Sequence, residues 1–161
     1  MATLTPFLWF NGRVEEAVEF YTSVFGDSAV EDISRYPEGS PGPAGDVMTA
    51  TLSLAGQQLT ILNGGPEYTL TPAFSFFVAC ADQAEVDHYW DRLCEGGKPV
   101  ACGWLEDKFG VSWQVVPTVL GELLADPDPE RSQRVMQAML AMTKLDIAGL
   151  QAAHAGAAQR P

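Results

Sequence analysis

The sequence predicts an α+β fold made of two similar modules and a helical tail. Residues 4–63 and 74–116 each contain an apolar strand, an amphipathic helix and then further strands, in the same order. Several of these strands alternate polar and apolar residues, as strands do in a sheet with one buried face. The residues after 126 carry helix signals instead. Together these three observations favour a duplicated, mostly antiparallel unit over a doubly wound parallel sheet.

The first module is predicted to open with a buried strand over 4–10 and a helix over 13–25. Asn11-Gly12 separates the two elements, and Gly26 is a typical helix stop. Strands are expected over 28–36, 47–55 and 58–63, with Gly56-Gln57 between the last two. Residues 37–46 contain three prolines and three glycines, which predicts a loop. The apolar face of the helix is formed by Val14, Ala17, Val18, Tyr21 and Phe25.

The second module repeats this order over 74–116. A strand over 74–80 precedes a helix over 83–95, which Asp82 is positioned to cap. Strand segments are expected at about 99–105 and 111–116. The turn between them, Asp107 to Gly110, is predicted to be solvated.

The tail is predicted to be helical. Asp128-Pro129-Glu130 combines a capping side chain with proline at the first helical position. A shorter helix is expected from Asp146 through Ala153, followed by a frayed end over 155–161. We expect one compact domain with three parts, at 1–66, 67–118 and 119–161.

Composition excludes several functional classes. Nine Lys and Arg against 21 Asp and Glu give a net charge of −12. Without clustered cations, binding to nucleic acid or to an anionic membrane surface is disfavoured. The N-terminal residues lack the pattern of a signal peptide, and the three cysteines form no CxxC pair. We therefore expect a cytoplasmic protein with reduced thiols.

Three segments resemble a known family. TPFLWFNGRVEEAVEFYTSVF at 5–25, CGWLEDKFGVSWQVVP at 102–117 and DPDPERSQRVMQAMLAM at 126–142 are similar to the PhnB-like branch of the vicinal oxygen chelate superfamily. That superfamily includes glyoxalase I, extradiol dioxygenases and bleomycin-resistance proteins. The branch often carries the name 3-demethylubiquinone-9 3-methyltransferase. The resemblance implies eight strands in a curved, mostly antiparallel sheet around a cavity, and a homodimer.

The resemblance also implies four metal-ligand positions, which this chain fills with weak ligands. Members that bind metal use His, Gln and Glu side chains from four strands. Here those positions fall at Thr5 or Pro6, at Asn63, at Ser75 and at Gln114. Because none is a histidine or a carboxylate, we expect no tightly bound metal. The methyltransferase name is also doubtful, since no strand leads into a glycine-rich turn and helix.

The cavity is expected to be mostly apolar with a few polar groups. Strand alternation places Leu8 with Phe10 and Ile61 with Asn63 around it. A register error of one residue would reverse each assignment. Gln114 is either a ligand contact or a satisfied buried amide, and Asn63 is either a contact or a turn residue. The candidate binding residues are Gln114, Asn63, Ser75, Phe10, Phe77, Ser112 and Trp104.

Three functions are compatible with these residues, and no catalytic residue is assigned. The first is a protein without a cofactor that binds a small, partly apolar molecule. The second is an enzyme that uses weakly held Mg²⁺ or Mn²⁺ on a substrate with adjacent oxygens. The third is resistance through binding of a cationic antibiotic, which the acidic charge would attract at low salt.

Overall fold

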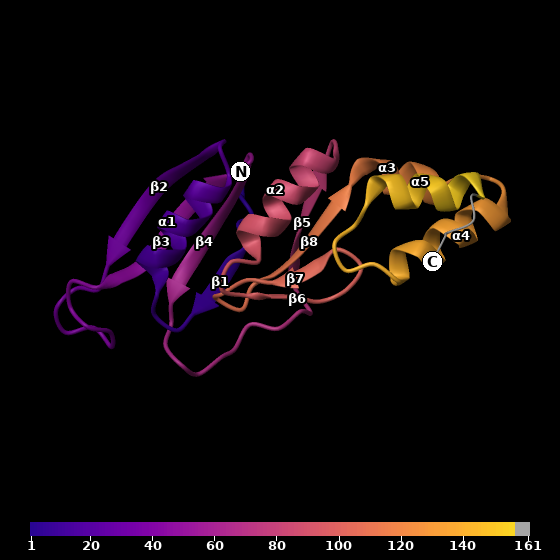
Figure 1. Ribbon diagram of the computed structural model, residues 1–161. Coiled ribbons are helices and arrows are strands. Elements are labelled where there is room, and N and C mark those ends of the chain that lie inside the picture. Colours follow the sequence, from indigo (N-terminus) through magenta and orange to yellow (C-terminus); the bar gives the residue numbers. More distant parts are fainter. Residues whose placement is uncertain (157–161) are drawn as a thin grey trace. The chain divides into compact units, whose positions relative to one another are not determined.

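The computed structural model describes residues 1–156 (Figure 1). The chain divides into two units, Met1–Leu70 and Thr71–Pro161. Each unit has its own four-stranded sheet, and the α+β fold with two β-α-β-β-β modules is confirmed. The unit boundary lies close to the expected one at 66, and the C-terminal helices belong to the second unit. Of the frayed end expected at 155–161, Ala155 is the last residue of a helix, and residues 157–161 lie outside the described residues.

The first unit contains one helix and one mixed sheet. The sheet order is β1-β4-β3-β2, in which β1 and β4 are parallel and the other pairs are antiparallel. The first and last strands of the module are therefore neighbours. The elements are β1 (Phe7–Phe10), α1 (Val14–Val24), β2 (Ser28–Arg35), β3 (Val47–Leu54) and β4 (Gln57–Asn63).

Helix α1 covers one face of this sheet with the apolar positions that the periodicity predicts. Val14, Ala17, Val18 and Tyr21 are all buried. Ala50 lies beneath α1, and strand pairing places Ile61 beside Ala50 and Leu8 beside Ile61. These three residues are at most 4% exposed, so they form the core between the helix and the sheet.

The turn between β3 and β4 lies one residue earlier than predicted. Ala55 and Gly56 form it, and both have positive φ, at 48° and 83°. A two-residue hairpin turn of this kind matches the right-handed twist of its strands. Glycine accepts this conformation without cost, whereas Ala55 is the uncommon residue in it.

The second unit repeats the topology with shorter strands. Its sheet order is β5-β8-β7-β6, and β5 is again parallel to the last strand, β8. The single strand expected over 99–105 is divided in two, because Cys102 and Gly103 turn the chain with φ of 56° and 84°. The elements are β5 (Ser75–Cys80), α2 (Gln83–Leu93), β6 (Lys98–Pro99), β7 (Trp104–Glu106) and β8 (Ser112–Pro117).

The sequence predicted a solvated turn at 107–110, but the first residue of this turn is buried. Asp107 is only 3% exposed. Its Oδ1 accepts hydrogen bonds from the backbone N–H groups of Phe109 and Val111, and its Oδ2 accepts one from Nε1 of Trp113. Buried carboxylates are stable when several donors surround them, and here the donors come from the turn itself and from β8.

Three helices follow β8: α3 (Thr118–Leu124), α4 (Pro129–Leu140) and α5 (Ile147–Ala155). Asp128 caps α4, as predicted, and Asp146 caps α5 rather than lying within it. Helix α3 was not predicted; it begins directly where β8 ends. The helices pack around a small apolar cluster of their own, formed by Val116, Leu120, Val135, Leu145 and Leu150.

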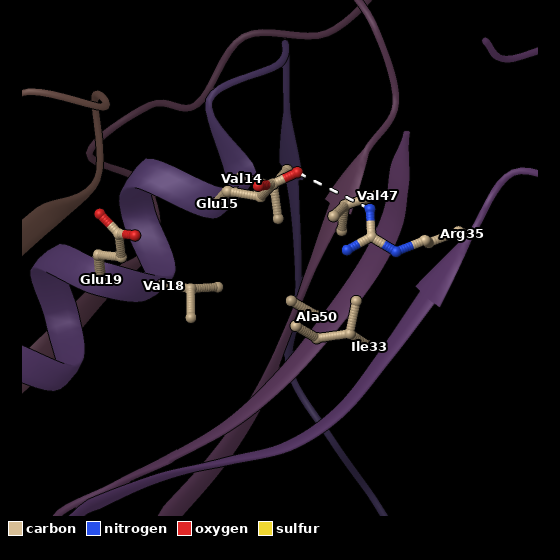
Figure 2. A pocket seen from close by; sticks show the side chains of 8 residues that line it. All are labelled: Val14, Glu15, Val18, Glu19, Ile33, Arg35, Val47 and Ala50. Carbon is tan, nitrogen blue, oxygen red and sulfur yellow. Dashed lines mark ion pairs between the residues drawn. The ribbon is translucent and has the colours of Figure 1, made fainter. Parts of the chain in front are cut away.

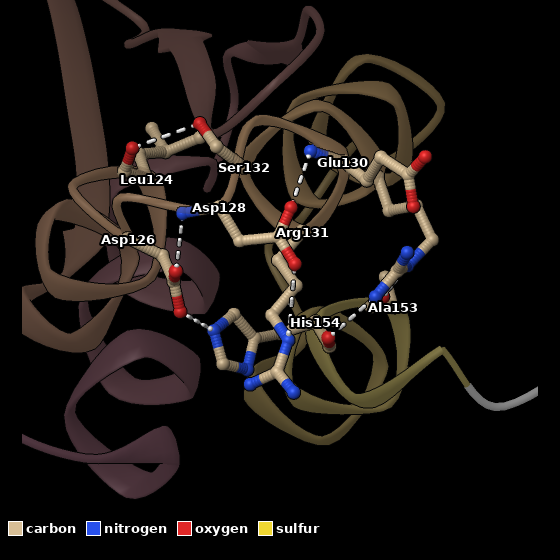
Figure 3. A network of polar contacts seen from close by, with 9 residues as sticks. Leu124, Asp126, Asp128, Glu130, Arg131, Ser132, Ala153 and His154 are labelled. Atoms are coloured by element: carbon tan, nitrogen blue, oxygen red, sulfur yellow. Dashed lines mark hydrogen bonds and ion pairs between the residues drawn. The ribbon is translucent and has the colours of Figure 1, made fainter.

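Polar contacts hold the end of α5 against the loop between α3 and α4 (Figure 3). His154 Nε2 lies 2.8 Å from Oδ2 of Asp126. The other carboxylate oxygen of Asp126 accepts the backbone N–H of Asp128 at 2.8 Å. These hydrogen bonds, first that from Asp128 and then that to His154, lower the pKa of Asp126.

Candidate functional site

The second sheet places five of the predicted binding residues on one face. Strand β8 lies between β5 and β7, and Gln114 on it is paired with Phe77 on one side and Trp104 on the other. Two residues earlier, Ser112 is paired with Ser75. Because alternate residues of a strand share a face, these side chains project from one side of the sheet, which we call the Gln114 face. Ser112 is buried on this side, at 4% exposed.

A hydrogen bond joins two residues of the Gln114 face. Nε2 of Gln114 donates to Oγ of Ser75 at 3.0 Å. This contact confirms that the two side chains project from the same side of the sheet. It engages one amide N–H and leaves the carbonyl oxygen of Gln114 as an acceptor.

The Gln114 face is the side of the sheet that α2 does not cover. Helix α2 packs against β5, β7 and β8. The residues that alternate with Gln114, including Trp113 and Val115, are at most 3% exposed. On the Gln114 face, by contrast, Phe77 is 59% exposed and Trp104 is half-buried. Phe77 and Trp104 thus leave apolar surface uncovered on either side of the Gln114 amide.

The two ends of the Gln114 face differ in character. At one end, Glu106 pairs with Ser112 across β7 and β8. Its carboxylate lies 3.6 Å from Nζ of Lys98 on β6. At the other end, Val116 is buried in the apolar cluster of the C-terminal helices. The face therefore runs from a charged, solvated edge to an apolar, covered one.

Asn63 and Phe10 lie in the first unit and have other surroundings. Oδ1 of Asn63 accepts the backbone N–H of Gly12 at 3.0 Å, and its Nδ2 donates to the carbonyl of Val47 at 3.3 Å. Both groups of its amide are thus engaged by the backbone. Phe10 is 4% exposed and shares the face of Leu8, which α1 covers. The residues that alternation placed around a cavity in this module therefore lie on the side of the sheet that α1 covers.

Strand pairing identifies different first-unit residues on the uncovered face. Phe7 pairs with Thr60 in the parallel β1–β4 pair, as Phe77 pairs with Gln114 in β5–β8. Phe7 is 63% exposed, close to the value for Phe77. Thr60 Oγ1 lies 2.9 Å from Thr51 Oγ1. Sequence reasoning missed Phe7 and Thr60, although the matching phenylalanines at equivalent strand positions were a visible signal.

Comparison with known proteins decides the family. Residues 2–116 match the family described as 3-demethylubiquinone-9 3-methyltransferase. The chain belongs to this family. Among solved structures, a PhnB protein of Bacillus cereus with the same methyltransferase name is 38% identical. It has a TM-score of 0.66, and the similarity covers 73% of this chain and 100% of that one.

Two further solved structures extend the comparison. A protein of Pseudomonas aeruginosa is 26% identical, with a TM-score of 0.61 over 73% of this chain and 98% of that one. The fosfomycin resistance protein FosX of Listeria monocytogenes, complexed with Mn(II) and a dihydroxypropylphosphonic acid, is 16% identical. Its TM-score is 0.53 over 70% of this chain and 90% of that one, so it shares the fold. No curated protein matches.

The vicinal oxygen chelate superfamily, to which the PhnB-like family belongs, is thus the correct fold family. The family match ends at residue 116, before α3 begins. The resemblance at 126–142 therefore stays a prediction.

The positions at which the resemblance implies metal ligands carry neutral side chains in this PhnB-like chain. Within residues 1–156, no three His, Cys, Asp or Glu side chains converge on one point. Gln114 and Ser75 already bond each other, and both are neutral. His154 bonds Asp126 in the tail, and His88 lies on α2 against the ring of Tyr89. This donor set does not fit zinc or nickel, which favour imidazole and anionic ligands.

Two of the three cysteines of this family member, Cys80 and Cys94, have thiols whose pKa is raised by burial. Cys80 is fully buried, and burial raises the pKa of its thiol to about 11. Burial also raises the pKa of the Cys94 thiol. Since the thiolate is the reactive form, neither is suited to nucleophilic chemistry at neutral pH.

No helix in the described part of the chain combines the length and apolar character that a membrane crossing requires.

Proposed function

We propose that the protein binds a small, partly apolar molecule on the Gln114 face, without a tightly held metal. The observation that carries this proposal is the position of Gln114, which donates a hydrogen bond to Ser75 and lies on the strand between those of Phe77 and Trp104. A site of this make-up, with aromatic walls and a few fixed polar groups, is common for small ligands.

Strand geometry supports a flat ligand group. Phe77 and Trp104 lie on the strands either side of β8. Two strand spacings separate their backbones by about 10 Å. Two aromatic walls at that separation leave space for one planar group above Gln114. The carbonyl oxygen of Gln114 then accepts a hydrogen bond from an N–H or O–H of that group.

The proposal includes no methyl transfer. Common methyltransferases use a doubly wound parallel sheet and bind their cofactor where a strand meets a helix N-terminus. Both sheets here have the order of a β-α-β-β-β module, with a single parallel pair each. We therefore do not take the methyltransferase name of the family as a guide to the reaction of this protein.

A weakly metal-dependent enzyme is the second candidate, and one carboxylate favours it. Glu106 lies on the Gln114 face beside Ser112. Mg²⁺ and Mn²⁺ accept one or two carboxylates together with waters and substrate oxygens. Such an ion would polarise a substrate with adjacent oxygens on this face. Full turnover of any such substrate in excess chelator would contradict this candidate.

Benzamide is a suitable first probe, because it combines one ring with an amide that complements Gln114. We expect titration to shift the ¹⁵N–¹H resonances of Phe77, Trp104 and Gln114. Gln114→Ala and Trp104→Ala should each weaken binding by about tenfold. Gln137→Ala on the exposed side of α4 is the matched control and should leave it unchanged. The proposal is wrong if a broad library of small aromatic amides and acids shifts none of these resonances.

A further inference from the structure

The first unit contains a cavity of about 160 Å³ between α1 and the β2–β3 hairpin (Figure 2). Val14 and Val18 of the helix line one side, and Ile33, Val47 and Ala50 of the hairpin line the other. The cavity lies on the helix-covered side of its sheet. All its lining residues belong to the first unit, whereas the Gln114 face belongs to the second unit.

Small side chains leave this space open. Ala50 is completely buried beneath the helix, where its methyl group reaches only part of the way to Val14 and Val18. Ile33 belongs to the same lining and yet is 43% exposed. Part of the apolar lining of the cavity, at Ile33, is thus open to solvent. A cavity of about 150 Å³ with apolar walls is large enough for one benzene ring.

Three charged side chains also line the cavity, and Figure 2 shows Glu15 beside Arg35 with Glu19 apart from both. Arg35 is already engaged: its Nη1 donates to the carbonyl of Gly45 at 3.0 Å and lies 4.0 Å from Oε1 of Glu15. Glu19, one helical turn after Glu15, also lines the cavity and forms no ion pair with any of the residues 1–156. With two carboxylates and one guanidinium, the opening is acidic.

We propose that this cavity binds a small primary amine whose apolar part is a single ring or a short branched chain. The apolar part would lie on Val18 and Ile33, above the buried Ala50. The ammonium group would meet the Glu19 carboxylate at the opening. A carboxylic acid of the same shape is disfavoured, because it would meet two carboxylates while the guanidinium of Arg35 is held by Glu15 and Gly45.

Three ligands of matched shape test both parts of the site. 2-Phenylethylamine, the neutral 2-phenylethanol and the anionic phenylacetate are titrated separately into ¹⁵N-labelled full-length protein. We expect the amine to shift the backbone resonances of Val18, Ile33 and Ala50 with saturation in the millimolar range. The alcohol should bind more weakly, and phenylacetate should bind most weakly.

Single variants test the Glu19 charge and the cavity volume separately. Glu19→Gln should weaken binding of the amine by about two- to fivefold, as expected for one exposed ion pair, and leave the alcohol unchanged. Glu67→Gln removes the same charge from an exposed position outside the cavity lining and should have no effect. Ala50→Leu fills the cavity and should abolish binding of both ligands. If Ala50→Leu does not fold, Ile33→Phe narrows the opening from a half-exposed position on β2.

Three results would overturn the proposal. The first is no saturable shift of the cavity residues by the amine. The second is equal binding of the amine and phenylacetate. The third is undiminished binding to a folded Ala50→Leu or Ile33→Phe protein.

Discussion

Nε1 of Trp113 donates a hydrogen bond to Oδ2 of Asp107 at 2.9 Å, and both side chains are buried. Oδ1 of the same carboxylate accepts the backbone N–H groups of Phe109 and Val111 at 2.9 and 3.0 Å. One side chain thus fixes the turn that leads into β8. Since β8 carries Gln114, Asp107 holds the central strand of the candidate site in register.

Replacing Asp107 should therefore destabilise the protein strongly. Asp107→Ala leaves three N–H donors without their acceptor, and we expect a loss of about 3 kcal/mol in the free energy of unfolding. Trp113→Phe leaves one carboxylate oxygen without its donor but keeps the two backbone hydrogen bonds of the turn, so it should cost less. Urea denaturation at pH 7 measures both. Equal losses for Asp107→Ala and for the exposed Asp32→Ala would contradict this role.

The side chain of Gln83 connects α2 to the segment before α5. Its Nε2 donates to the carbonyl of Leu145 at 3.2 Å, and its Oε1 accepts the backbone N–H of Ile147 at 2.8 Å. Gln83→Ala removes both contacts, so amide hydrogen exchange at Ile147 should accelerate while exchange at Val115 in β8 stays slow. The expected loss of stability is about 1–2 kcal/mol. Unchanged exchange at Ile147 would show that this contact is not needed to hold α5.

Stability should depend on Asp126 at low pH. The backbone N–H of Asp128 and the side chain of His154 lower the pKa of Asp126 below its ordinary value of about 3.9. A carboxyl group with a lowered folded pKa stabilises the protein above its unfolded pKa, and that contribution is lost as pH falls through the folded value.

The difference in stability between wild type and Asp126→Asn should thus be constant down to about pH 5 and shrink below about pH 4. Chemical denaturation at several pH values measures it. Asp32→Asn on the exposed strand β2 makes the same charge change away from this contact and is the matched control. A difference that persists undiminished at pH 2 would contradict the assignment.

The donor set of the Gln114 face predicts a specific response to metal. Wild-type protein dialysed without chelator should hold less than stoichiometric zinc, nickel or manganese by elemental analysis. Gln114→Glu places a carboxylate beside Ser75 and should produce weak Mn²⁺ binding, detectable by electron paramagnetic resonance. Gln137→Glu, with the same charge change on α4, should not. Stoichiometric metal in the wild type would show that other ligands form a site.

Local signals in the sequence were enough for the topology and for part of the site. Asp128 before Pro129 fixed the start of α4. On β8, alternation placed Ser112 and Gln114 on one face, and the hydrogen bond from Gln114 to Ser75 confirms that Ser75 shares it. These predictions succeeded because caps and side-chain alternation are set by residues close in sequence.

The failures have equally specific causes. Phe10 and Asn63 were expected around a cavity, but they lie on the helix-covered side of their sheet, which strand pairing and burial reveal and alternation alone does not. Helix α3 was missed because it follows β8 without a break. The turn at Cys102 requires a left-handed conformation that cysteine rarely adopts. The homodimer and the cytoplasmic location stay predictions, since both depend on surroundings outside a single chain.

The parallel pairing of first and last strands has a consequence for synthesis of the chain. Phe7 in β1 pairs with Thr60 in β4, and Ser75 in β5 pairs with Ser112 in β8. Neither sheet can be completed until its last strand has left the ribosome, and closing such long loops slows folding. The first unit is free to fold while the second is still being translated. A pause in translation after β4 has left the ribosome and before β8 is synthesised would therefore favour correct pairing of β1 with β4 over mispairing with β8.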